Sequence, residues 1–223
     1  MSITSWRTDW VTSKCEIALA LAKGAGGAGY GEAAIIISSA LTALASEMWP
    51  GLRQDRARFI ELLVRMSPNR PSLSTVSIPL LVQYLRMHQE HSQNALVLAT
   101  RFLPAGTSLV VTGPDVDRSE YEILALLPSI SVRLLRQFSY ACLLYEELRT
   151  SYAHQYQPGQ KADSWPMTML PNRAVSYVNK ITERRIHFHI EWLAQLALEV
   201  VMQIDSAFAN IPPSRPAVWW INE

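Results

Sequence analysis

The hydrophobic pattern predicts a chain made mostly of helices. Residues 13–23 and 32–49 fit two helices separated by a glycine-rich segment. The second helix is apolar on nearly every side, which is typical of a central, buried helix. A third helix is expected after Asp55, its predicted N-cap, because apolar side chains recur at i, i+3, i+4 and i+7 from Phe59 onward.

Proline and glycine divide the middle of the chain. Residues 77–102 fit one helix, whereas the short apolar segment at 109–111 gives no clear prediction of secondary structure. Ser119, followed three residues later by Glu122, predicts a capping box for the next helix. Pro128 interrupts that helix, after which residues 129–153 fit one long helix.

The last third of the chain changes its period. Apolar residues alternate over 175–179 and again over 186–190, which predicts a small β-hairpin. A helix over 192–209 follows, and the tryptophans of the tail are expected to pack on the domain. The predicted fold is therefore mainly α, an antiparallel helical bundle with one small β-hairpin near the C-terminus. We expect a single domain over residues 1–223, with a helical and loop elaboration at about 67–118.

Composition narrows the class of protein. With 49% hydrophobic and 17% charged residues, the 223-residue chain can bury a substantial core. Twenty basic against 19 acidic side chains do not indicate the strongly basic surface of a general nucleic-acid-binding protein, but they permit a local basic site. Cys15 and Cys142 lack the spacing of paired metal ligands, which favours two reduced thiols. The pattern indicates neither a signal peptide nor a membrane span, so we expect a soluble, cytoplasmic protein without a membrane partner.

The most specific chemical suggestion lies at residues 147–156. Arg149 precedes His154 by five residues and Tyr156 by seven, at the end of the long predicted helix. Arginine can hold a phosphate with two hydrogen bonds and stabilise negative charge in a transition state. Histidine can transfer protons near neutral pH, and tyrosine can bind phosphate or stack on a base. These side chains suffice for internal RNA cleavage without a metal or a cofactor.

Helical geometry restricts how these side chains act. His154 lies about 140° around a regular helix from Arg149, so the two do not stack within one helix. They can meet across a groove, or across a two-fold axis where two copies of the helix face each other. Tyr145, Tyr152 and Tyr156 fall on the same stripe as Arg149. The alternative is that Arg149 and His154 only complement the C-terminal dipole of the helix.

The motif resembles a known family. Arg149 to Tyr156 is similar to the Arg-x4-His-x-Tyr signature of HEPN-domain ribonucleases, and residues 33–45 and 55–63 are similar to early helices of some of these proteins. The resemblance implies a dimerising, antiparallel helical bundle with one composite, metal-independent endoribonuclease site. It further implies that Arg149 and His154 form the catalytic pair, in a toxin or defence component.

The resemblance also suggests roles for the neighbouring residues. Tyr156 matches the tyrosine that is adenylylated in the toxin branch paired with a minimal nucleotidyltransferase, so an antitoxin of that type is a candidate partner beside RNA. Thr150 stands where active members often have Asn, Asp or His, and with Tyr152 it is a candidate substrate-binding or regulatory residue. The alternative reading is a non-catalytic HEPN-like module that binds a nucleotide, RNA or a protein.

Basic residues surround the predicted hairpin. If the hairpin lies beside the Arg149 groove, they are candidate RNA contacts; otherwise they form a solvated face. These residues are Arg173, Lys180, Arg184 and Arg185.

Two further patterns are interpreted as structural. Gly24 to Gly29 spells GxGxxG, but it follows a predicted helix instead of a strand, so an interhelical loop is favoured over a dinucleotide site. The pairs His88/His91 and His187/His189 lack a third ligand at matching spacing. We therefore predict no metal site.

Overall fold

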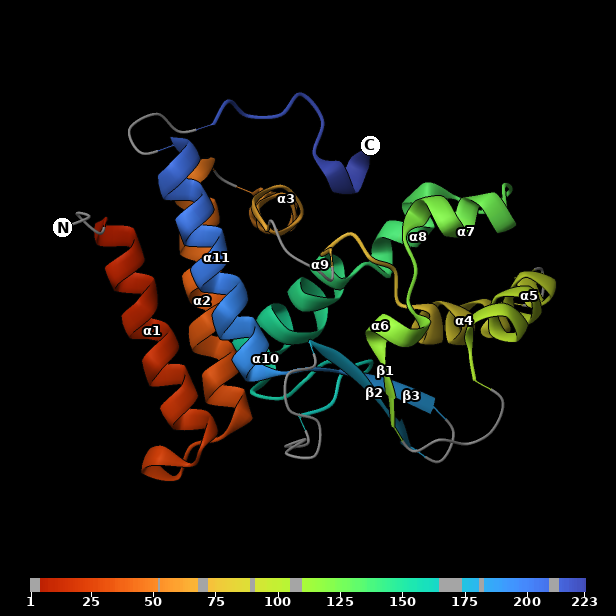
Figure 1. Cartoon of the computed structure of the whole chain (residues 1–223), viewed down its shortest axis with the longest axis horizontal. Coiled ribbons are helices and arrows are strands. Elements are labelled where there is room, and N and C mark those ends of the chain that lie inside the picture. Colours follow the sequence, from red (N-terminus) through yellow and green to blue (C-terminus); the bar gives the residue numbers. More distant parts are fainter. Residues whose placement is uncertain are drawn as a thin grey trace.

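The computed structural model describes residues 5–51, 53–67, 72–88, 91–104, 110–164, 174–180, 183–208 and 213–223. The protein is mainly helical and carries a small three-stranded antiparallel sheet (Figure 1). Within these ranges, every helix is too short or too polar to cross a lipid bilayer.

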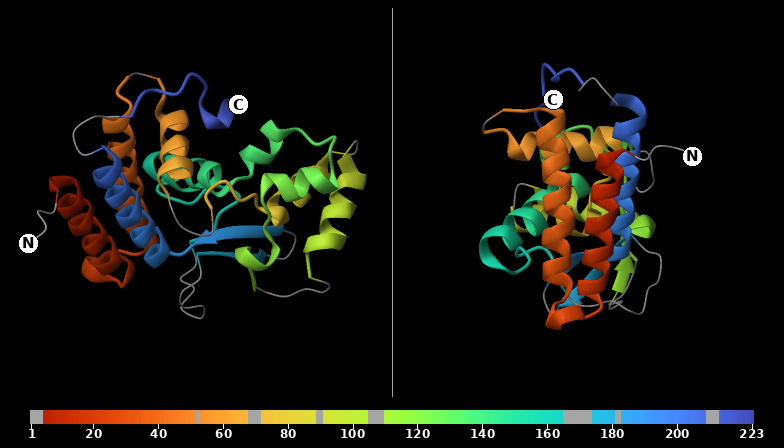
Figure 2. Two further views of the ribbon diagram at one scale, coloured as in Figure 1. Left: turned by 45° about the horizontal axis from the view of Figure 1, so that its top comes forward. Right: turned by 90° about the vertical axis from the view of Figure 1, so that its left-hand side faces the viewer.

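Three long helices lie side by side at one end of the molecule. They are α1 (Trp6–Ala22), α2 (Tyr30–Met48) and α11 (Ile190–Phe208), and α1 packs on both of the others (Figures 1 and 2). In Figure 1, α1 runs antiparallel to α2 and α11. The helix predicted over 32–49 is confirmed, and the helix predicted over 192–209 begins two residues earlier at Ile190.

The first helix begins well before the predicted residue 13. Ser5 caps it by accepting a hydrogen bond from the Thr8 N–H. Arg7 then joins Glu47 of α2 at 2.7 Å and Asp205 of α11 at 3.3 Å. These contacts fix the first turns of α1 against its two neighbours. They come from distant parts of the chain, so a local pattern does not reveal them.

The third helix, α3 (Asp55–Met66), forms where predicted, but its cap differs. Asp55 is the first helical residue, Gln54 occupies the N-cap position without capping through its side chain, and the Asp55 carboxylate accepts from Arg58. The prediction of Asp55 as N-cap was wrong, because the guanidinium of Arg58 binds the Asp55 carboxylate.

The single helix predicted over 77–102 is also wrong. The chain instead forms α4 (Ile78–Met87) and α5 (Ser92–Phe102), which pack on each other. His88 leaves the helical conformation with φ −109° and ψ 102°, and its ring lies 4.4 Å from that of Tyr84. Folding back lets both helices bury apolar residues against one another, which one straight helix cannot do.

The helix predicted over 129–153 is divided. After α7 (Glu120–Leu126), whose Ser119–Glu122 capping box is confirmed, the chain forms the short helices α8 (Val132–Gln137) and α9 (Tyr140–Leu143). A π-helix, η3 (Leu144–Thr150), and α10 (Ser151–Gln155) follow. The prediction was wrong because the N–H groups of Tyr140 and Ala141 donate to the carbonyls of Thr75 and Leu73, at 3.0 and 2.9 Å.

The predicted hairpin is confirmed and extended by one strand. Strands β2 (Val175–Lys180) and β3 (Glu183–Phe188) pair antiparallel. The apolar segment for which the sequence predicted no secondary structure contributes the edge strand β1 (Val110–Thr112), which pairs with β2. The short helix α6 (Gly113–Val116) follows β1. The sheet thus joins parts of the chain that lie more than sixty residues apart in sequence.

A buried carboxylate lies between the sheet and the helices. Asp117 accepts hydrogen bonds from the hydroxyls of Tyr140 at 2.5 Å and Tyr177 at 2.6 Å, and from the Ile78 N–H at 2.9 Å. Burial raises the pKa of Asp117 to about 7, because the charged form loses its hydration. Both tyrosines are fully buried, so this network links α9, β2 and the start of α4.

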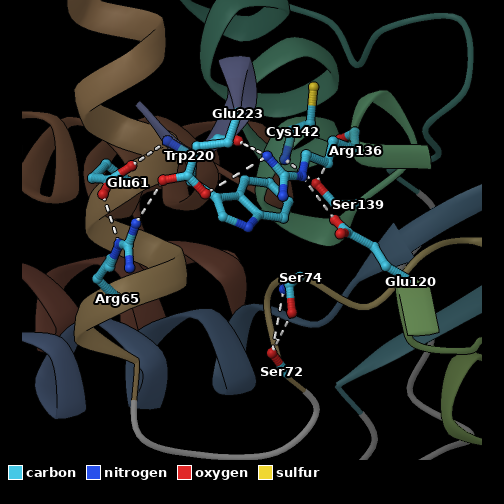
Figure 3. A network of polar contacts seen from close by, with 10 residues as sticks. All are labelled: Glu61, Arg65, Ser72, Ser74, Glu120, Arg136, Ser139, Cys142, Trp220 and Glu223. Atoms are coloured by element: carbon cyan, nitrogen blue, oxygen red, sulfur yellow. Dashed lines mark hydrogen bonds and ion pairs between the residues drawn. The ribbon is translucent and has the colours of Figure 1, made fainter. Parts of the chain in front are cut away.

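The tryptophan tail packs on the domain as predicted. Trp219 and Trp220 are both buried, and the Arg136 guanidinium lies 4.6 Å from the centre of the Trp220 ring. The Trp220 N–H donates to the buried Glu61 carboxylate at 2.7 Å, which Arg65 also contacts (Figure 3). The C-terminal segment therefore ties α3 to α8.

Trp220→Ala is expected to lower the free energy of unfolding by about 3–5 kcal/mol. The substitution removes a buried indole and its contact with Arg136. Urea denaturation measures the effect, and Trp6→Ala, at a position that is 64% exposed, is the matched control. The control is expected to change stability by less than about 0.5 kcal/mol. Equal losses in the two variants would contradict this account of the tail.

Candidate functional site

The Arg–His–Tyr motif spans the junction of the π-helix and α10. Arg149 lies in the last turn of η3, and His154 lies near the end of α10. Tyr156 ends α10 in the left-handed conformation, with φ 55°. π-Helical turns are rare and are often found at functional sites.

Local hydrogen bonds explain why the helix widens here. The Ser151 hydroxyl donates to the Glu146 carbonyl at 2.9 Å, and the Gly159 N–H donates to the Glu147 carbonyl at 2.9 Å. The Glu147 carboxylate also accepts from the Lys161 N–H at 3.0 Å. The Glu147 carbonyl, which would accept only a helical N–H in a regular α-helix, is therefore bound by a segment that folds back after the motif. This return segment holds the motif in place.

Arg149 is half-buried and has no carboxylate partner in the described parts of the chain. Its guanidinium lies 5.3 Å from the centre of the Tyr145 ring, which is a cation–π distance. Together with Ala153 it lines a groove of about 270 Å³ between the motif and α2. A permanently charged donor that is not neutralised inside the protein is available to an anion.

Hydroxyl groups form the other wall of this groove. Ser38, Thr42 and Ser46 line it from α2, with Ser39 beside them. The first three donate their protons to carbonyls of α2 itself, at 2.7–3.2 Å, so their remaining lone pairs accept hydrogen bonds. The groove thus combines one strong cationic donor with acceptor oxygens, a combination that suits a sugar–phosphate backbone.

His154 and Tyr156 are exposed and do not line this groove. Tyr156 is 78% exposed, the second most exposed of the large apolar and aromatic residues recorded. The structure therefore does not bring Arg149 and His154 into one groove within a single chain, which leaves the two-fold axis as the way for them to meet. Both side chains are accessible to a ligand or to a second copy of the chain.

Two neighbours of the motif are placed differently from the prediction. Tyr152, a candidate substrate contact, is buried in the core, with its ring 6.2 Å from that of Tyr30 and packed on Gly31. Burial raises its pKa to about 12. The hydroxyl of Thr150 is enclosed and has no hydrogen-bond partner among the described residues. Tyr152 thus holds the motif against α2, and direct contact with substrate would require it to leave the core.

The basic residues of the hairpin lie away from the motif. Gln83 of α4 exchanges hydrogen bonds with the backbone of Arg184, and Arg185 pairs with Glu183 at 2.7 Å. Strand β3 packs on α4, and Figure 1 shows α10 at the opposite end of β2 and β3. The hairpin therefore does not lie beside the Arg149 groove within one chain, so Arg184 and Arg185 cannot contact the same RNA segment there. Arg173 and the side chain of Lys180 lie outside the described residues.

A second cavity, of about 700 Å³, was missed by sequence reasoning. The glycine-rich turn lines it together with Tyr30 and the buried His187 and His189. Gly24, Gly26 and Gly27 adopt positive φ, which explains the glycines by backbone conformation. Within the described ranges, no cluster of three or more His, Cys, Asp or Glu side chains is placed to hold a metal ion.

Comparison with known proteins gave no match, whether to a family model, to a curated protein or to a solved structure.

Proposed function

We propose that the protein is a HEPN-like, metal-independent endoribonuclease that acts as a homodimer. The observation that carries the proposal is the environment of Arg149. Its guanidinium has no carboxylate partner among the described residues and faces a groove lined with hydroxyl oxygens. A solvent-accessible histidine, His154, follows five residues later in α10.

The proposed reaction is attack of an RNA 2′-oxygen on the adjacent phosphorus. His154 of one copy accepts the 2′-hydroxyl proton as the new P–O bond forms. Arg149 binds the phosphate and stabilises the negative charge that accumulates on its oxygens. The 5′-oxygen leaves and takes up a proton from water. The products are a 2′,3′-cyclic phosphate and a 5′-hydroxyl.

The placement of His154 supports a dimer. In one chain His154 lies outside the groove that contains Arg149, so its imidazole does not face a phosphate bound there. A two-fold axis beside α10 would present the histidine of one copy to the groove of the other. Tyr156, exposed at the end of the same helix, would then stack on a base or contact a phosphate. The same exposure would make its hydroxyl accessible to a nucleotidyltransferase-type partner in a toxin or defence system.

RNA cleavage in EDTA tests the proposal. Purified protein is incubated with structured and unstructured RNAs, and the products are separated and their ends identified. The expected result is internal cleavage that leaves 2′,3′-cyclic phosphate ends and needs no added metal. Absence of cleavage on every RNA, or cleavage that stops in EDTA, would contradict it.

A mixture of inactive variants tests the composite site. Arg149→Ala and His154→Ala chains are unfolded together, refolded and assayed against each variant alone. A mixed dimer contains one intact Arg149 and one intact His154 on different chains, so the mixture is expected to recover about a tenth or more of wild-type cleavage. No recovery, with mixed dimers shown by mass spectrometry, would mean that both residues act within one chain.

A second function is favoured by Thr150. Its enclosed hydroxyl cannot contact a substrate, unlike the polar residue often found there in active HEPN members. A non-catalytic module that binds RNA, a nucleotide or a protein through the Arg149 groove would need no such contact. Salt-dependent RNA binding that Arg149→Ala weakens, without cleavage by wild type, would support this alternative.

A further inference from the structure

The 700 Å³ cavity lies where four segments of the chain meet. The end of α1, the glycine-rich turn, the end of β3 and the start of α11 all contribute to its lining. Its volume is in the range of small-molecule sites in proteins. The space beside the turn is open, since a Cβ atom added at Gly24 or Gly29 would meet nothing within 4 Å. It is distinct from the Arg149 groove and shares no lining residue with it.

One buried side chain of this cavity, His187, has a ring nitrogen with no hydrogen-bond partner among the described residues. His187 is only 3% exposed, and its Nδ1 lies 3.1 Å from the Asp163 carbonyl. A carbonyl can only accept, so Nδ1 carries the proton and Nε2 of the neutral ring is an acceptor. No donor among the described residues reaches Nε2, and it occupies the edge of the ring opposite the Asp163 carbonyl. Burial lowers the pKa of His187, which keeps the ring in this neutral form.

Donors for an anion lie at the same cavity. Ile190 and Glu191 begin the 19-residue helix α11, and the described residues supply no acceptor for their N–H groups. Lys23 lines the cavity and has no carboxylate partner within the described ranges. The start of α2 is already occupied, since the Gly29 N–H donates to Glu32 at 2.9 Å. An anion in this cavity would therefore be held by the start of α11 and Lys23, and not by the start of α2.

We propose that this cavity binds a small molecule that carries one anionic group and at least one hydrogen-bond donor. The phosphate or carboxylate lies between Lys23 and the first N–H groups of α11. A hydroxyl or amino group donates to Nε2 of His187. The Glu191 carboxylate, which also lines the cavity, accepts from a further donor and disfavours ligands with a second anionic group. A hydroxylated phosphate monoester and a free amino acid both fit this description.

Titration with simple probes tests the proposal. Ribose 5-phosphate and L-serine represent the two sources of the anionic group, and ribose and inorganic phosphate represent the separate parts. Calorimetry measures affinity, and long-range ¹H–¹⁵N spectra report the histidine nitrogens. We expect the free protein to show His187 protonated on Nδ1, and one of the first two probes to bind saturably and shift the Nε2 resonance. The probe that binds distinguishes a phosphate from an amino-acid ligand.

Three variants complete the experiment. Lys23→Ala, at an exposed side chain, is expected to weaken binding about tenfold through loss of a charge-assisted contact. Ala28→Trp fills the cavity and is expected to abolish binding, with its fold checked by circular dichroism. Lys14→Ala, on the helix that Lys23 caps but outside the cavity, is expected to bind normally. If no probe shifts His187 at millimolar concentration, or if Lys23→Ala binds as tightly as wild type, the proposal is wrong.

Discussion

Arg149→Ala and His154→Ala are each expected to lower the rate of RNA cleavage by about 10²–10⁴-fold. The first removes the group that holds the phosphate and stabilises its extra charge. The second removes the proton-transfer group. Arg149→Lys keeps the charge but loses the planar two-donor geometry, so we expect an intermediate rate. Single-turnover cleavage in EDTA measures all three variants.

Matched controls separate chemistry from folding. Gln155→Ala changes an exposed neighbour of His154 on the same helix, and Arg133→Ala removes an exposed arginine of α8. Both are expected to cleave at the wild-type rate. Arg149→Ala also loses its contact with the Tyr145 ring, which costs about 0.5–1 kcal/mol of stability. Thermal unfolding checks that this loss stays small. Cleavage that persists in both His154→Ala and Arg149→Ala would exclude the proposed site.

The second large effect is expected from Asp117, whose protonation makes the stability of the protein depend on pH. Burial raises the pKa of Asp117 to about 7, whereas an aspartate in an unfolded chain titrates near about 3.9. Between these values the folded protein holds a proton that the unfolded chain releases. The contribution of Asp117 to stability is therefore greatest below about pH 4 and is lost as pH rises through about 7. A shift of about three pKa units corresponds to about 4 kcal/mol.

Buried histidines act in the opposite direction. Burial lowers the pKa of His187, and it lowers that of His189 to about 4. The unfolded chain binds more protons than the folded protein at these sites as pH falls below about 6.5, so their contribution to stability rises with pH. The stability of wild type alone is the sum of opposing slopes and does not isolate Asp117.

The difference between wild type and Asp117→Asn removes the histidine contribution. An asparagine oxygen still accepts from Tyr140 and Tyr177, while its amide opposes the Ile78 N–H at a cost that is independent of pH. Relative to this variant, wild type is expected to lose about 4 kcal/mol of stability between pH 4 and pH 7.5. Urea denaturation across this range measures the difference. Asp9→Asn, at an exposed carboxylate, is the control, and parallel curves for wild type and Asp117→Asn would contradict the prediction.

The helix-dominated class followed from local spacing. The apolar pattern of α2, the Ser119–Glu122 box of α7 and the alternation of β2 and β3 depend on neighbours in sequence, and all three formed. The second strand of the hairpin begins three residues before its predicted start, at Glu183, and ends at Phe188, because Ile190 already belongs to α11. The errors arose where distant segments compete for backbone hydrogen bonds. Thr75 and Leu73 take the amides of Tyr140 and Ala141, which divides the long helix before the motif. Nothing in residues 129–153 shows that such acceptors will be present.

The candidate site likewise has some features that follow from local sequence and others that depend on distant segments. The sequence by itself determined the spacing of Arg149, His154 and Tyr156, and that spacing already excludes a direct pair on one regular helix. Only the tertiary structure decided that Arg149 faces the hydroxyls of α2 and that Tyr152 is buried against Gly31. It also decided that the turn at Gly24 opens a cavity onto His187, which follows more than 160 residues later. The spacing of side chains along a helix is a local property, whereas burial, ion pairing and cavities depend on which distant segments pack together.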